Sequence, residues 1–210
     1  MMLSSIKAVA FDAFGTLVDI HDKRRPYAKL AAKAVKQVQS PMTRRISLES
    51  YADDCSAVIS SEDLSDLSSD LEAEITSTRP FIETVHVLKT LRDRGIRTAV
   101  ASNLAFPYAQ LIQAKLGHLL DAECWSFDVG STKPDFKFYA ALSALLQLSG
   151  PEILMVGDSW RGDFLGAKEA GFQALFLDRS GIFTEDRRSV SIASLSGLLD
   201  HFGSSFARTM

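Results

Sequence analysis

The chain has 210 residues, of which 46% are hydrophobic and 23% charged, and its formal net charge is -3 at pH 7. These values are typical of a globular protein with one sizeable core and room for an inserted subdomain. They argue against a nucleic-acid-binding chain, because the basic clusters at 23–25 and 187–188 are short and typical of solvated faces. No segment approaches the ~18 apolar residues of a membrane span, and the N-terminus lacks a signal-peptide pattern. We therefore expect a small-molecule ligand and no nucleic-acid or membrane partner, while the oligomeric state stays open.

The two cysteines, Cys55 and Cys124, are far apart in the sequence and lack the spacing of metal ligands. Such isolated cysteines indicate a reducing compartment and plain burial in the core. We therefore expect a cytoplasmic protein.

The first predicted element is a short apolar run that ends at a carboxylate. Residues 7–11 have the pattern of a buried strand, and Gly15 with Thr16 turns the chain just after it. Asp12 therefore stands at the carboxyl end of a strand, the edge at which open α/β sheets bind ligands. A turn or helix-cap role is the alternative for a single aspartate at this place.

Between residues 21 and 78 the pattern changes from strand to helix. Apolar side chains at three- and four-residue spacing predict helices within 27–38, 48–55 and 64–75. We interpret 21–78 as a small helical cap subdomain inserted after the first strand. The core domain would then consist of residues 1–20 and 79–210.

Beyond residue 79, predicted strands and helices alternate. The helices cover 81–94, 107–116, 135–147, 163–170 and a short segment after Ser194, and the strands begin at 97, 123, 153 and 173. Such alternation predicts a parallel sheet with helices on both faces, a three-layer Rossmann-like α/β core.

Small polar side chains and one lysine follow the middle of this pattern. Ser102 and Asn103 end the strand that starts at 97, and both can donate a proton to an anionic oxygen. Capping of the helix near Pro107 is an equally good explanation for either residue. Lys133 precedes Pro134, and a lone lysine is more often a solvated surface charge than a functional group.

The most specific signal follows the strand 153–156. Gly157 and Asp158 come next, and Asp163 stands five residues after Asp158, so two carboxylates flank a short loop. Carboxylates on a loop at a strand edge suit Mg²⁺, which takes one or two protein carboxylates and leaves its other positions to water and substrate. Trp160 and Arg161 lie in the same loop, where an arginine could bind an anionic group.

Together the four segments resemble the four ordered motifs of the haloacid dehalogenase superfamily of hydrolases. These motifs are a D-x-x-G-T loop, a strand-end serine or threonine, a lysine, and a G-D-x-x-x-x-D loop. The resemblance implies that Asp12 is a nucleophile and that Ser102, with Asn103, binds the transferring group. It also implies that Lys133 neutralises negative charge on the nucleophile and on the intermediate.

The same resemblance implies a metal site. Asp12, Asp158 and the backbone carbonyl of Phe14 would hold Mg²⁺, and Asp163 would support the metal or Lys133. A carboxylate that attacks phosphorus forms an acyl phosphate, which divides one difficult hydrolysis into two easier steps. The positive charges would offset the repulsion between the two anions that must meet.

Phe14 departs from the commonest phosphatase pattern of this superfamily, in which a second aspartate supplies general acid and base assistance. Such assistance is typically worth ~10²–10⁴-fold. An aromatic residue there, and the stretch 177–181, resemble members that cleave carbon–halogen bonds without a metal. We give more weight to the loop with Asp158 and Asp163. Clustered carboxylates repel one another, so a contribution to stability does not explain why two of them are present.

The sequence therefore predicts a Mg²⁺-dependent phosphatase of a small phosphorylated metabolite. A metal-independent 2-haloacid dehalogenase and a non-catalytic binding protein are the alternatives.

Overall fold

The central element is a sheet of six parallel strands in the order β5-β4-β1-β6-β7-β8. The computed structural model describes residues 5–182 and 184–202. The predicted core domain, residues 1–20 and 79–210, therefore begins before the first described residue and ends after the last one. The strands are β1 Ala8–Phe11, β4 Arg97–Ser102, β5 Ala122–Trp125, β6 Ile153–Gly157, β7 Gln173–Leu177 and β8 Ser191–Ile192. The predicted parallel α/β sheet is confirmed.

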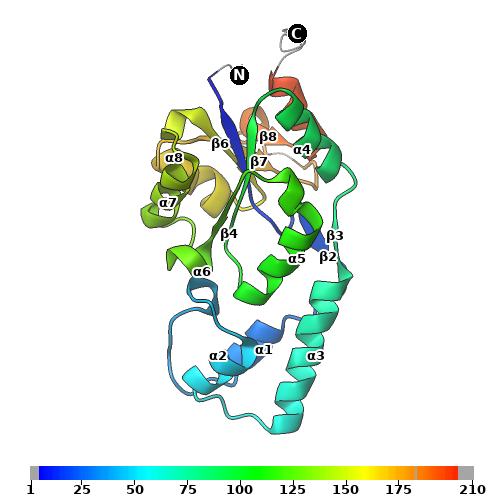
Figure 1. Ribbon diagram of the computed structural model, residues 1–210, viewed down its shortest axis with the longest axis vertical. Helices are drawn as coiled ribbons and strands as arrows, with labels where there is room; N and C mark the ends of the chain where they lie inside the picture. The colour runs from blue at the N-terminus through cyan, green and yellow to red at the C-terminus, as the bar shows by residue number, and fades with distance from the viewer. Residues whose placement is uncertain (1–4, 183, 203–210) are drawn as a thin grey trace.

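Alternation along β1 explains why helices cover both faces of the sheet. Val9 and Phe11 belong to one apolar cluster, and Ala8 and Ala10 belong to another. Successive side chains of a strand point to opposite faces, so a strand that is apolar throughout needs a cover on each side. Figure 1 shows α4 and α5 on one side of the sheet and α7 and α8 on the other.

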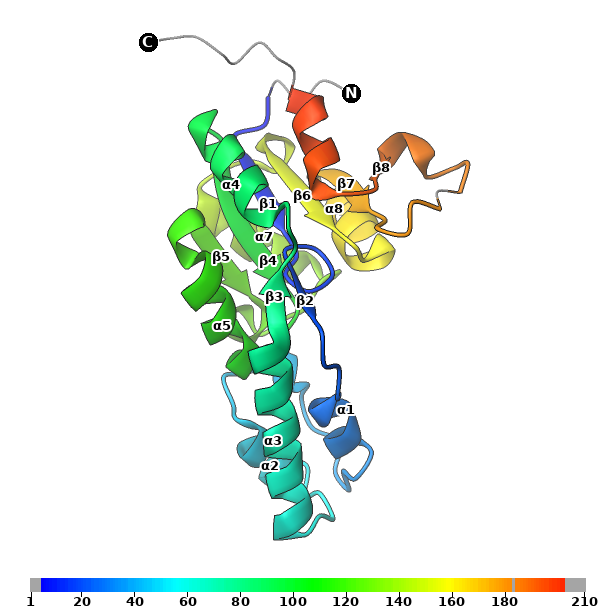
Figure 2. The same cartoon turned by 90° about the vertical axis from the view of Figure 1, so that its right-hand side faces the viewer.

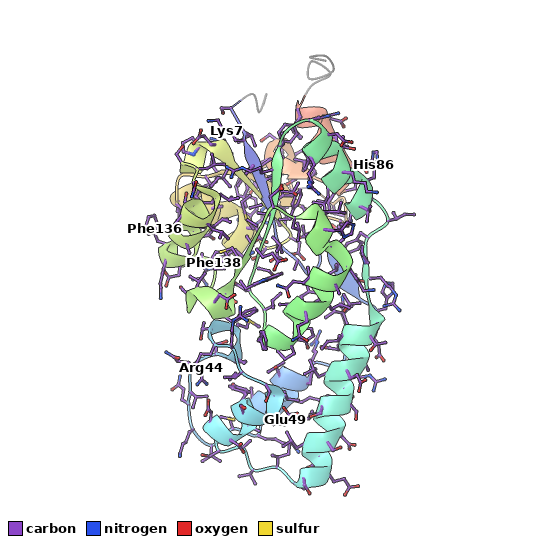
Figure 3. The ribbon with its side chains drawn as sticks, in the orientation of Figure 1. Lys7, Arg44, Glu49, His86, Phe136 and Phe138 are labelled. Carbon is purple, nitrogen blue, oxygen red and sulfur yellow. The ribbon has the colours of Figure 1, made fainter. Side chains whose placement is uncertain are left out.

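Helices of 4–11 residues precede or connect the strands of this sheet. They are α4 Thr84–Asp93, α5 Phe106–Leu116, α6 Ser126–Val129, α7 Phe136–Leu146 and α8 Gly166–Glu169, and a 3₁₀ helix spans Leu195–Phe202. On α7, Phe138 is buried while Phe136 is 68% exposed, because side chains two positions apart lie on nearly opposite sides of a helix. Figure 3 shows these two rings pointing in different directions.

Residues 21–78, which we call the helical segment, lie beyond the carboxyl ends of the strands (Figure 1). They contain α1 Pro26–Ala31, α2 Leu48–Asp54, α3 Ser61–Ser77 and a 3₁₀ turn at Pro41–Thr43. A two-stranded antiparallel ribbon, β2 Val18–Ile20 with β3 Thr78–Pro80, carries the chain into this segment and out of it. Figure 2 shows the ribbon between the sheet and the long α3.

The helical segment differs from the sequence prediction in one respect. The apolar stripe within 27–38 predicts one helix, but α1 ends at Ala31. Val35 continues that stripe in the sequence, but its side chain is 67% exposed. Burial of Val35 therefore does not stabilise a longer helix. The other two predicted helices correspond to α2 and α3.

Elements of two or three residues were not predicted, namely β2, β3 and β8, because so short a strand carries no recognisable alternation. The helix predicted from Asp163 begins earlier, as a π-helical turn over Trp160–Leu165 that leads into α8. Among the described residues, every helix is too short or too polar to cross a lipid bilayer.

Candidate active site

The order of the strands creates a crevice beside β1. The chain passes from β1 to β4 and β5 on one side, and then returns to β6 on the other side of β1. Such a switch point leaves the carboxyl ends of the central strands open to ligands. Phe11 is in register with Val100 and Val156, so Asp12 follows the central strand at the level where β4 and β6 end.

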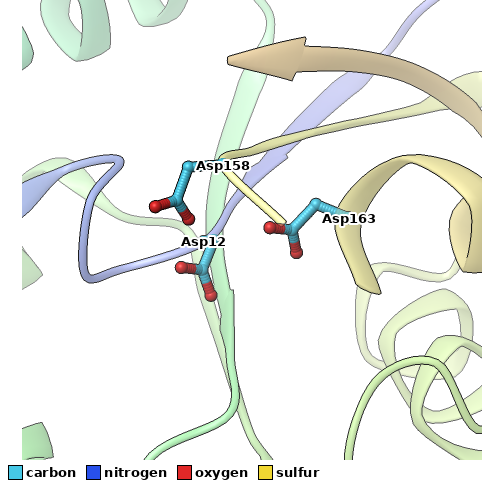
Figure 4. A group of neighbouring side chains, drawn as sticks. All are labelled: Asp12, Asp158 and Asp163. Atoms are coloured by element: carbon cyan, nitrogen blue, oxygen red, sulfur yellow. The ribbon is translucent and has the colours of Figure 1, made fainter. Parts of the chain in front are cut away.

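Three carboxylates meet in this crevice. One oxygen atom from each of Asp12, Asp158 and Asp163 lies within 4.8 Å of the others. Figure 4 shows the three side chains converging from separate segments. The pKa of Asp158 is raised to about 6, because neighbouring protein atoms displace water and because Asp12 and Asp163 place negative charge nearby. Burial likewise raises the pKa of Asp163, and the cluster therefore attracts a cation.

Lys133 supplies positive charge inside the protein. Its Nζ donates hydrogen bonds to Asp12 Oδ1 at 2.8 Å, to Asp163 Oδ1 at 2.6 Å and to the Ala101 carbonyl at 2.6 Å. Burial alone lowers the pKa of Lys133, but the two carboxylates outweigh that effect and the pKa is raised. The lysine is therefore a buried cation against Asp12, and the alternative of a solvated surface charge is wrong.

Asn103 fixes the backbone that carries this lysine. Its Nδ2 donates to the Lys133 carbonyl at 2.9 Å, and its Oδ1 accepts from the Lys133 N–H at 2.8 Å. Both ends of the amide are thus engaged, and one amide hydrogen remains for a ligand. Ser102 is 1% exposed at the last position of β4. The structure brings both residues to the crevice that also holds Asp12.

Asp163 is held on both of its oxygens. Oδ2 accepts a hydrogen bond from the Ser159 N–H at 2.9 Å, and Oδ1 accepts the bond from Lys133. The side chain is fully buried and folds back over Gly157, where an added Cβ would lie 2.2 Å from Asp163 Oδ2. This geometry suits Asp163 to orient Lys133 and the loop, and it leaves Asp12 and Asp158 as the carboxylates best placed to ligate a metal.

The loop after β1 lies directly against one of these carboxylates. Gly15 has a φ of 77°, and a Cβ at this position would lie 2.1 Å from Asp158 Oδ2. The Asp158 carboxylate therefore rests against the peptide that follows Phe14. Mg²⁺ takes oxygen ligands at about 2.0–2.1 Å, so two oxygens on opposite sides of one ion are about 4 Å apart. The carboxylates of Asp12 and Asp158 supply oxygen donors of the kind that Mg²⁺ takes.

Arg179 holds this loop from a distant part of the chain. Its Nε donates to the Gly15 carbonyl at 2.9 Å, and its Nη2 donates to the Thr16 carbonyl at 2.7 Å. Nη1 donates to Glu83 Oε1 at 2.8 Å, and the guanidinium lies 3.5 Å from the centroid of the Phe81 ring. Sequence reasoning missed this role, because no local pattern connects residue 179 with residues 15 and 16.

Trp160 and Arg161, both in the loop after β6, lie in different surroundings. Trp160 stacks on Phe164 with ring centroids 4.4 Å apart, and the Arg187 guanidinium lies 4.1 Å from the Trp160 centroid. Trp160 is thus a packing residue. Arg161 is exposed to solvent.

Comparison with known proteins identifies the family. A model of the haloacid dehalogenase-like hydrolases matches residues 6–171. The chain belongs to this hydrolase family. The predicted superfamily membership and hydrolase class are thus confirmed.

Relatives of this haloacid dehalogenase-like hydrolase include both phosphatases and dehalogenases. It is 28% identical to the (S)-2-haloacid dehalogenase of Pseudomonas sp. strain YL, over 86% of each chain. It is 29% identical to the glyceraldehyde 3-phosphate phosphatase of Methanothermobacter thermautotrophicus, in a match that spans 48% of this chain and 45% of that protein. Its fold matches the crystal structure of a phosphatase of this family from Thermococcus onnurineus, with a TM-score of 0.68, 22% identity and coverage of 94% and 98%. Membership of the family therefore does not decide whether the chain cleaves a phosphate ester or a carbon–halogen bond.

Proposed function

We propose that this hydrolase is a Mg²⁺-dependent phosphatase that acts on a small phosphorylated metabolite through a covalent intermediate on Asp12. The observation that carries the proposal is the cluster of three carboxylates around one buried lysine. Lys133 compensates Asp12 and Asp163, whereas Asp158 has no cationic partner within the part of the chain that the structure describes. A divalent cation would balance that remaining charge.

In the proposed reaction, an Asp12 oxygen attacks phosphorus, and the bond from phosphorus to the leaving oxygen breaks. Lys133 holds Asp12 in place and offsets the charge that builds up on the phosphoryl oxygens. Ser102 and the free amide hydrogen of Asn103 donate to those oxygens. Bound Mg²⁺, held by Asp12, Asp158 and the Phe14 carbonyl, would lower the repulsion between the carboxylate and the phosphate. Water then hydrolyses the acyl phosphate and regenerates Asp12.

A metal-independent 2-haloacid dehalogenase is the second candidate. It is favoured by the aromatic side chain of Phe14, since halide leaves without a proton, and by the match to the Pseudomonas enzyme over 86% of each chain. A non-catalytic binding protein is less consistent with the site, because mere binding does not require a carboxylate nucleophile paired with a buried lysine.

The deciding experiment measures turnover of acetyl phosphate, aryl phosphates and 2-chloropropionate, each with Mg²⁺ and with excess chelator. We expect hydrolysis of phosphates only, and only with Mg²⁺. Asp12→Asn and Asp158→Asn should abolish that turnover, whereas Asp93→Asn, an exposed control at the end of α4, should not change it. Release of halide in the presence of chelator would reject the phosphatase and support the dehalogenase.

The cytoplasmic location also remains a prediction. It is supported by the two cysteines, both of which are free and buried.

A further inference from the structure

Three successive backbone carbonyls of the loop after β1 accept hydrogen bonds from segments far along the chain. Arg179 donates from Nε to the Gly15 carbonyl at 2.9 Å and from Nη2 to the Thr16 carbonyl at 2.7 Å. The next carbonyl, that of Leu17, accepts from the Phe81 N–H at 3.1 Å. The loop is thus fixed at three consecutive positions, and one guanidinium group makes the first two contacts.

The Arg179 side chain is itself held in one orientation. Its guanidinium carbon lies 3.5 Å from the centroid of the Phe81 ring, and Nη1 donates to Glu83 Oε1 at 2.8 Å. Stacking on the ring fixes the plane of the guanidinium, and the bond to Glu83 fixes its rotation within that plane. Because the N–H groups of an arginine form a rigid planar fork, this arrangement also fixes the direction of the two bonds to the loop.

The loop that Arg179 holds lies against a carboxylate of the active site. A Cβ at Gly15 would be 2.1 Å from Asp158 Oδ2, so the backbone and the carboxylate are in close contact. Glycine peptides rotate more freely than others, and the bond from Arg179 to the Gly15 carbonyl restricts that rotation. Asp158 forms no ion pair within the described part of the chain, so the neighbouring loop limits where its carboxylate lies.

We infer that Arg179 is a positioning residue of the active site. Through the carbonyls of Gly15 and Thr16 it keeps the loop against Asp158, and it thereby keeps Asp158 oriented toward Asp12. The inference rests on the proposed phosphatase function, in which these two carboxylates ligate the metal. Arg179 acts through the loop and not by contact with the metal or the substrate. Removal of such a support typically weakens metal binding by about 10–100-fold.

The first test measures metal affinity directly. Mn²⁺ is the probe, because carboxylate and carbonyl oxygens bind it as they bind Mg²⁺. In calorimetric titrations, Arg179→Gln should bind Mn²⁺ at least about tenfold more weakly than the parent protein. Arg179→Lys keeps the charge but lacks the planar fork, so it should lose nearly as much. Arg94→Gln is the matched control and should bind Mn²⁺ as the parent does. Arg94 is also partly buried and donates to a carbonyl, that of Leu199, but it precedes β4 and so lies at the opposite edge of the sheet.

Chemical rescue separates the geometry of the guanidinium from its charge. Arg179 lines a surface pocket of about 390 Å³, so Arg179→Ala opens a space that a small cation can reach from solvent. Guanidinium ion, at a concentration that does not unfold the protein, should restore most of the Mn²⁺ affinity lost in Arg179→Ala. Methylammonium at the same ionic strength should restore little, since it lacks the planar donors. Equal effects of the two ions would overturn the positioning role.

Hydrogen exchange in metal-free protein tests the loop without any ligand. The N–H groups of Leu17 and Val18 both donate to the Ala13 carbonyl, at 2.8 and 2.9 Å. In Arg179→Gln these amides should exchange about tenfold faster, the size expected for loss of one hydrogen bond that supports the loop. In Arg94→Gln their exchange should equal that of the parent. Unchanged exchange in Arg179→Gln would overturn the inference.

The outcomes distinguish this inference from the proposed function. Weaker Mn²⁺ binding and faster exchange in Arg179→Gln, without turnover of any phosphate ester by the parent, would reject the phosphatase and keep the role of Arg179. Turnover of phosphates by the parent, with the same Mn²⁺ affinity in Arg179→Gln, would overturn the inference and leave the phosphatase standing. A parent protein that binds no Mn²⁺ would reject both.

Discussion

The sheet edge and the helical segment contribute to one site in opposite ways. At the sheet edge, Asp12, Lys133 and Asp163 are joined by hydrogen bonds of 2.6–2.8 Å between charged groups that are largely removed from water. The helical segment contributes mainly apolar and aromatic walls, such as Pro26 and Tyr27, to a pocket of about 280 Å³. Buried charges are costly to separate, whereas apolar walls tolerate changes of similar volume. The charged residues at the edge of the sheet therefore determine the reaction, and the walls from the helical segment limit which molecules can enter the site.

One buried charge lies in the helical segment, and it connects that segment to the core. Glu74 of α3 is 3% exposed, and its Oε1 accepts from the N–H groups of Arg24 and Arg25 at 2.6 Å each. Its Oε2 accepts from the Tyr108 hydroxyl on α5. Glu74 therefore fixes the start of α1 and the wall of the pocket together.

The largest effect is expected at Lys133. Lys133→Met leaves Asp12 and Asp163 facing each other without a cation, and removal of one partner from a buried pair costs about 3–5 kcal/mol. Urea unfolding measures that loss of stability. Lys137→Met, at an exposed position of α7, is the control and should change the free energy of unfolding by less than about 0.5 kcal/mol. Adding Asp163→Asn to Lys133→Met should recover part of the loss, and an unchanged midpoint in the single variant would contradict the role of the lysine.

Gly15→Ala should come next, and Gly95→Ala is its matched control. Both glycines have left-handed φ values, 77° and 73°, but a Cβ at Gly95 meets nothing within 4 Å, whereas one at Gly15 strikes Asp158. Both variants should lose about 1–2 kcal/mol of stability to backbone strain. Only Gly15→Ala should also weaken metal binding, by about 10–100-fold, as displaced supports of metal ligands do. Titration with Mn²⁺, followed by calorimetry, measures the difference, and equal affinities would show that Asp158 does not ligate the metal.

Glu74→Gln tests the link between the helical segment and the core. The amide accepts fewer of the three hydrogen bonds, and bonds to a charged group are worth about 1.5–3 kcal/mol, so we expect a loss near the lower end of that range. The KM of an aryl phosphate should rise while metal affinity stays the same. Glu72→Gln, exposed on the same helix, should alter neither quantity. A change in metal affinity in Glu74→Gln would mean that the two regions are not separable as described.

The smallest effect is expected at the pair of Arg45 and Asp128, which joins the helical segment to α6. Both side chains are partly exposed, at 59% and 37%, and exposed ion pairs contribute about 0–1 kcal/mol. Asp128→Asn should therefore shift the thermal midpoint only slightly, and the shift should shrink further in high salt. A loss as large as that of Glu74→Gln would indicate that this contact, rather than Glu74, holds the two regions together.

Much of the site was predictable because parallel strands share an edge. Asp12, Ser102 and Asp158 each follow a recognisable apolar run, and strands that run in parallel bring such residues together. Lys133 was predictable only through the likeness to a family, since nothing in its local sequence distinguishes it from a surface lysine. The part played by Asn103 was also hidden, because its partners are the backbone groups of residue 133.

Other features had no sequence signal. The ribbon of β2 and β3 joins two three-residue strands that are distant in the sequence, and Arg179 reaches carbonyls more than 160 residues earlier. The early end of α1 depends on the absence of a packing surface for Val35. Contacts of this kind follow from how separate elements meet and leave no periodicity along the chain.

The sequence by itself determined the alternating strands and helices, the polar residues at the strand ends and the membership of a hydrolase family. These follow from local patterns, since periodicity of apolar residues and the ends of strands are written in neighbouring positions. Only the tertiary structure decided that Asp163 is closed off on both oxygens, that Gly15 lies against Asp158, and that an aromatic pocket adjoins the nucleophile. Those features arise where segments far apart in the chain are packed against one another, and packing depends on the shape of every partner at once.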